Sequence, residues 1–89
     1  MSAAPQVRPG RELYVRHARL DGRSVAVLRA IDEGERCVIE VDVWPTGPDD
    51  PPSSTSAGPY VFPSSADATR FVTHAVETLI ALGCEVRAS

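Results

Sequence analysis

The most regular pattern of hydrophobic and polar positions lies near the end of the chain and predicts one amphipathic helix over residues 65–82. Apolar residues recur there every three or four positions, so at about 100° per residue they fall on one face, with polar residues opposite. Ser64 or Ser65 provides the N-cap, and Gly83 suits the left-handed conformation that ends many helices. The apolar face consists of Ala68, Val72, Ala75, Val76 and Leu79.

Three segments before the helix have the patterns of β-strands, and we expect them to span residues 12–20, 23–31 and 35–44. Asp-Gly and Asp-Glu-Gly sequences separate them, and both are typical of hairpin turns. The third segment alternates most strictly, which predicts that one stripe of its side chains packs on the core. This stripe consists of Cys37, Ile39, Val41 and Val43.

Proline-rich segments of low hydrophobicity divide the rest of the chain. We expect residues 1–10 to form a disordered arm and residues 45–58 to form a flexible Pro/Ser-rich loop, because neither can supply a core. A short fourth strand at residues 59–63 is bracketed by prolines, which predicts a position at an edge of the sheet. The single domain then spans residues 11–86 and is followed by a tail at 87–89, unless the last residues add a short edge strand.

The predicted order β-β-β-β-α indicates an α+β fold, in which a four-stranded antiparallel meander carries one C-terminal helix on one face. With 89 residues, the chain has room for one domain with a small core. One helix covers only part of four strands, so we expect the other face of the sheet to be uncovered and partly apolar. Candidates for apolar side chains on that uncovered face are Tyr14, Leu28, Val38 and Trp44.

The composition limits the classes of partner. The formal net charge is −3, with nine basic and twelve acidic residues, which argues against a general affinity for nucleic acid or anionic lipid. All the basic residues are arginine, which, with many Ala, Pro, Gly and Val residues, is typical of a GC-rich bacterial genome. Residues 1–10 lack the apolar run of a secretory signal, and no apolar stretch is long enough to span a membrane. We therefore expect the chain to be cytoplasmic.

No arrangement of residues points to catalysis or to a metal. The two cysteines and two histidines are scattered, whereas zinc ligands usually come in short-spaced pairs, so we expect neither a metal nor a cofactor. Cys37 is better interpreted as a small core residue. Glu40 and Asp42 lie on one face of a strand, where a solvated sheet surface explains them more simply than acid–base chemistry. We predict no catalytic residue, and we do not expect an enzyme.

The stretch from Val25 to Gly83 ends in a helix that begins at Ser64–Phe71 (SSADATRF) and finishes at Ala81–Gly83 (ALG). In the order of its elements and the register of this helix, the chain resembles a single repeat of the PUR family of nucleic-acid-binding proteins. The resemblance implies four antiparallel strands followed by one helix. In that family two repeats intertwine and the sheets contact single-stranded nucleic acid. The present chain differs in having no lysine and an acidic balance, which leaves the pairing of two copies as the shared expectation.

We therefore predict a non-enzymatic interaction domain whose partner is another protein or a second copy of itself, bound through the uncovered sheet face or an edge strand. The candidate interaction surface consists of Tyr14, Arg16, Val38 and Trp44. Trp44 either anchors such an interface or covers the open end of the core. The first alternative is a single-stranded nucleic-acid-binding module of PUR-like topology that uses Tyr14, Arg16 and Trp44. The second alternative is a small enzyme without a recognisable motif.

Overall fold

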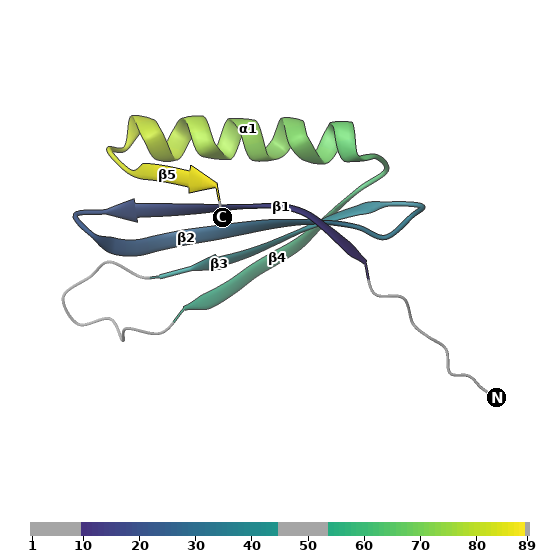
Figure 1. Cartoon of the computed structure of the whole chain (residues 1–89), viewed down its shortest axis with the longest axis horizontal. Coiled ribbons are helices and arrows are strands. Elements are labelled where there is room, and N and C mark those ends of the chain that lie inside the picture. Colours follow the sequence, from purple (N-terminus) through teal and green to yellow (C-terminus); the bar gives the residue numbers. More distant parts are fainter. Residues whose placement is uncertain (1–9, 45–53, 89) are drawn as a thin grey trace.

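A computed structural model describes residues 10–44 and 54–88 and shows an antiparallel sheet with one helix (Figure 1). In these residues the sheet has five strands rather than four, in the order β4-β3-β2-β1-β5, so the predicted α+β class is confirmed and the strand count is corrected. The elements are β1 (Arg11–Leu20), β2 (Arg23–Asp32), β3 (Cys37–Val43), β4 (Thr55–Phe62), α1 (Ser65–Ala81) and β5 (Glu85–Ala88).

The additional strand, β5, forms because the chain reverses after α1 and returns alongside β1. Its four residues pair antiparallel with the second half of β1, from Arg16 opposite Ala88 to Arg19 opposite Glu85. Arg87 and Ala88, expected in the C-terminal tail, therefore belong to the sheet. A strand of four residues whose only large apolar side chain is Val86 has too little alternation to be recognised, and its backbone pairing with β1 defines it.

The fourth strand begins earlier than its apolar residues suggest. β4 starts at Thr55, so residues 55–58, expected in the flexible loop, belong to the strand, and residues 55–57 pair with β3. Ser56 lies opposite Asp42 and donates a hydrogen bond to its carboxylate at 3.1 Å. A strand at the edge of a sheet can carry polar side chains, and β4 is an edge strand as its prolines predicted. The rest of the predicted loop, residues 45–53, and residues 1–9 of the predicted arm lie outside the described residues.

The predicted helix is confirmed at both ends. The Ser64 hydroxyl accepts a hydrogen bond from the backbone N–H of Asp67 at 3.2 Å, which identifies Ser64 rather than Ser65 as the N-cap. At the other end Gly83 has a φ of +98°, and the N–H of Cys84 donates to the carbonyl of Leu79 at 2.9 Å. This is the Schellman arrangement. No helix in the described ranges combines the length and apolar character needed to cross a membrane.

The hydrophobic core lies between α1 and one face of the sheet and is built largely from small side chains. Ile39 and Cys37, from the stripe predicted on β3, are the largest fully buried side chains. Val43, at the end of the same stripe, is 37% exposed. Leu28 also belongs to this core, which corrects its expected place on the uncovered face. The buried alanines of the core are Ala18, Ala26, Ala30 and Ala68.

The assignment of the N-cap is testable by unfolding in urea. Ser64→Ala should destabilise the protein by about 1 kcal/mol, because the N–H of Asp67 loses its acceptor in the first helical turn. Ser65→Ala is the matched control and should leave the free energy of unfolding within about 0.5 kcal/mol of the wild type, because Ser65 is exposed. An equal loss in both variants would contradict the assignment.

Candidate functional site: the open face of the sheet

We call the face of the sheet turned away from α1 the open face. Side chains alternate between the two faces along a strand, so residues next to core residues project from the open face. On β3, for example, Ile39 is completely buried in the core, and its neighbours Val38 and Glu40 therefore lie on the open face. The pairing register then shows which open-face side chains of adjacent strands are neighbours.

The four residues predicted to form one interaction surface lie on two different faces. Tyr14 lies on the helix side, where its hydroxyl is 2.9 Å from the hydroxyl of Thr69. The guanidinium of Arg16 lies 4.8 Å from the centre of the Tyr14 ring. The expected place of Tyr14 on the uncovered face is therefore corrected.

Val38 and Trp44 occupy the other side. Val38 is on the open face, and the alternation of β3, continued by one residue, places the half-buried Trp44 there as well. The backbone N–H of Trp44 donates to the carbonyl of Val25 at 2.9 Å, which extends the pairing of β3 with β2. The structure therefore does not bring Tyr14 and Arg16 together with Val38 and Trp44, as either a protein-binding surface or the alternative nucleic-acid-binding surface would require.

One row of the open face is apolar, and we call it the apolar row. It consists of Ile31 on β2, Val38 on β3 and Val61 on β4, which lie directly opposite one another in the register. Val38 is only 6% exposed, whereas Val61 is 53% exposed. Val61 was not among the predicted site residues. The alternation of residues 60–62 could have identified Val61, because it places Val61 on the face opposite its two aromatic neighbours.

In the next row of the open face, Val15, Arg29 and Glu40 lie opposite one another, and Arg29 also forms an ion pair with Glu12, which lies opposite Ile31. Arg29 on β2 bonds Glu12 on β1 at 3.0 Å and lies 3.7 Å from Glu40 on β3. Each of these exposed ion pairs contributes about 0–1 kcal/mol to the free energy of unfolding, and its main effect is to neutralise opposite charges. They agree with the interpretation of Glu40 as part of a solvated sheet surface.

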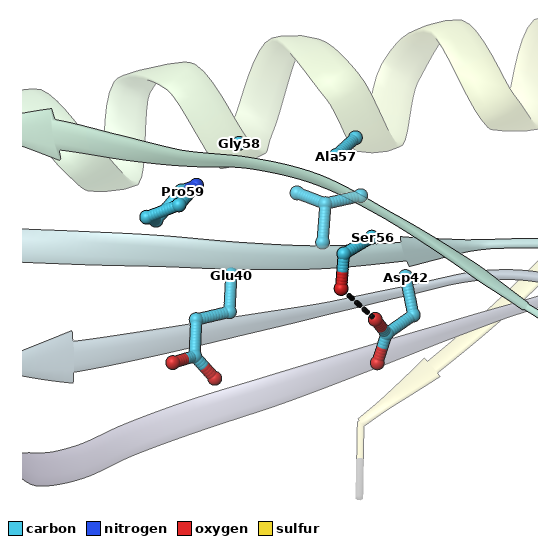
Figure 2. Close-up of a pocket in the computed structure, with 7 residues that line it drawn as sticks. Glu40, Asp42, Ser56, Ala57, Gly58 and Pro59 are labelled. Carbon is cyan, nitrogen blue, oxygen red and sulfur yellow. Dashed lines mark hydrogen bonds between the residues drawn. The ribbon is translucent and has the colours of Figure 1, made fainter.

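A hollow of about 320 Å³ lies between β3 and β4, where one extra residue interrupts their pairing. Figure 2 shows Glu40, Asp42 and Ser56 projecting from one side of the strands and Ala57 from the other. The Ser56 hydroxyl donates to Asp42, and no histidine or cysteine lines the hollow. The hollow therefore offers hydrogen-bond acceptors but no activated nucleophile.

A second hollow, of about 360 Å³, lies where β5 joins β1, at the far end of β1 from the apolar row. We call it the β1–β5 hollow. Within it the guanidinium of Arg87 bonds the carboxylate of Glu85 at 2.8 Å. This hydrogen bond, together with the charge of Arg87, lowers the pKa of Glu85 and raises the pKa of Arg87. The hollow is lined by His17, Arg19, Gly22, Glu85, Arg87 and Ala88.

Both cysteines are buried and lie apart from the histidines. Cys37 is 1% exposed, as expected of a core residue, and burial followed by the charge of Asp32 raises the pKa of its thiol. Cys84 is also buried, and both thiols are free. His74 projects from the solvent side of α1. Across residues 10–44 and 54–88, no group of three or more potential metal ligands gathers.

Comparisons with protein-family models, curated proteins and solved structures found no match to this chain. The resemblance to a PUR repeat therefore stays a prediction.

The ion pair between Glu85 and Arg87 in the β1–β5 hollow predicts that the stability of the fold depends on pH. Because the pKa of Glu85 is lower in the folded protein, the pair stabilises the fold above the ordinary pKa of glutamate, and this contribution is lost as the pH falls through the lowered value. Carbon-detected NMR should show the Glu85 carboxyl titrating at unusually low pH, and Arg87→Ala should return its midpoint towards the ordinary value. Arg36→Ala, which removes the separate 2.7 Å pair with Glu33, is the control. An unchanged midpoint in Arg87→Ala would contradict the assignment.

Proposed function

We propose that this chain is a non-enzymatic interaction domain that associates with a second copy of itself through the open face, centred on the apolar row. The supporting observation is the position of that row. Ile31, Val38 and Val61 adjoin one another across three strands, on a face that α1 does not cover, and the outermost of them is half exposed. Apolar side chains gathered on one uncovered surface favour contact with another protein.

The open face is a better contact surface than either edge of the sheet. On β4, Pro59 has no N–H to donate, the pairing with β3 is interrupted beside it, and Pro63 follows the strand. On β5, only four residues are present, and Glu85 and Arg87 are charged. Proline, irregular pairing, short length and charge are the features by which edge strands avoid adding another strand.

A second copy is the favoured partner because the core is small. Of the eleven apolar residues that are buried in the described part of the chain, four are alanine and two are cysteine, so few large side chains stabilise the fold. Domains of this size bury a small share of their surface on folding, and an interface between two copies increases the buried share. Two copies related by a two-fold axis would bring the two apolar rows against each other, in the manner of packed sheets.

Sedimentation equilibrium tests the proposal at micromolar concentration. Val61→Lys should weaken self-association at least about tenfold. Full burial of a valine side chain is worth roughly 1.5–3 kcal/mol, and Val61 is half exposed, so about half of that free energy would be gained on association. The two-fold axis would bury Val61 of both copies, which doubles the gain. Lysine is well tolerated in edge strands, so the fold should survive.

The matched control is Ile80→Lys. Ile80 is 55% exposed, nearly the same as Val61, but lies on α1, and a lysine there is favoured by the helix dipole. Its association should equal that of the wild type. A wild-type protein that remains a strict monomer at high micromolar concentration, or equal weakening by both variants, would overturn the proposal.

A further inference from the structure

The β1–β5 hollow is lined by more basic than acidic side chains, although the protein is acidic overall. The chain has a formal charge of −3, yet the hollow is lined by two arginines, one histidine and a single acid. The register explains this concentration. Arg87 lies directly opposite His17, and Arg19 lies directly opposite Glu85, so these four side chains project from the same face of two paired strands.

A hydrogen-bond contact and a glycine shape the lining of the hollow. The Nε2 of His17 is 3.0 Å from the hydroxyl of Ser24 on β2, which orients the imidazole ring. The hairpin between β1 and β2 borders the hollow at Gly22, which has a φ of +78°, and apart from its two chain neighbours no residue has an atom within 4 Å of where a Cβ would stand.

The hollow already contains an oxyanion of the protein's own. The carboxylate of Glu85 is held at 2.8 Å by Arg87, and the charge of Arg19 also acts on it. Arg87 binds this carboxylate in the way that arginine binds oxyanions generally, phosphate included. A phosphate dianion carries more charge and more acceptor oxygens than one carboxylate, so it should compete with Glu85 for Arg87.

We propose that the β1–β5 hollow is a binding site for a small phosphate-class oxyanion, held by Arg19 and Arg87 with His17 beside it, and that Glu85 is the internal competitor that leaves Arg87 when the anion binds. The ligand is either free phosphate or the phosphate group of a small monoester. The site lies at the far end of β1 from the apolar row and does not depend on self-association.

The test is a titration followed by NMR at constant ionic strength, with chloride as the reference salt. Inorganic phosphate should produce saturable shifts at the Arg19 and Arg87 side chains and at the amides of β5. Arg19→Ala combined with Arg87→Ala should abolish saturation. A second arm uses glycerol phosphate, and tighter binding than inorganic phosphate would identify a monoester as the ligand class.

The deciding variant is Glu85→Gln, which removes the competing carboxylate. It should tighten phosphate binding about two- to fivefold, the range expected from breaking one exposed ion pair. Glu33→Gln is the control, because it removes the partner of Arg36 outside the hollow. Repeating the titration in Val61→Lys separates this site from self-association. Phosphate shifts that match those of chloride, or unchanged or weaker binding in Glu85→Gln, would overturn the proposal.

Discussion

A helix about 10–12 Å across cannot cover a sheet whose five strands, spaced about 4.8 Å apart, span roughly 20 Å. Because residues 10–44 and 54–88 contain one such helix, this mismatch of width determines which surfaces of the sheet are buried. α1 starts from the end of β4 and finishes beside β5, at the opposite edge. In Figure 1 it runs alongside β5, while β3 and β4 diverge from it. Small residues such as Ala18, Ala30 and Ala68 form much of the contact and allow close approach.

The surface that the helix leaves exposed has different chemistry along its length. At the end where β1 begins, Ile31, Val38 and Val61 adjoin one another and offer apolar area. Where β1 ends, the β1–β5 hollow concentrates positive charge around a single carboxylate. Between them Arg29 joins the charges of β1 and β3. The surface proposed to contact a second copy and the site proposed for a small anion therefore lie at opposite ends of the sheet.

Sequence reasoning was accurate where the physical signal is local and weaker where it depends on pairing. The serine N-cap, the turn at Gly83 and the core stripe through Ile39 follow from a few consecutive residues each. The few residues around each position do not show which face of the sheet a β1 side chain occupies. Both stripes of β1 mix apolar with polar side chains, and register shifts near Leu13 and at Ala18 break the alternation. The candidate site was recovered only in part: Val38 was predicted, but Val61 was not, although the alternation of residues 60–62 places it on the face opposite its aromatic neighbours.

The amino-acid sequence by itself determined the amphipathic helix, the glycine that ends it, the two hairpins and the inward stripe of β3, because hydrophobic period, capping and turn chemistry act over a few residues. The choice of Ser64 over Ser65 as the N-cap came from the structure. Only the tertiary structure decided that Tyr14 and Arg16 lie on the helix side. It also decided that the last four described residues complete the sheet as β5. Both outcomes depend on which strands pair and in which register, and that choice is made by backbone hydrogen bonds and packing between segments far apart in the chain.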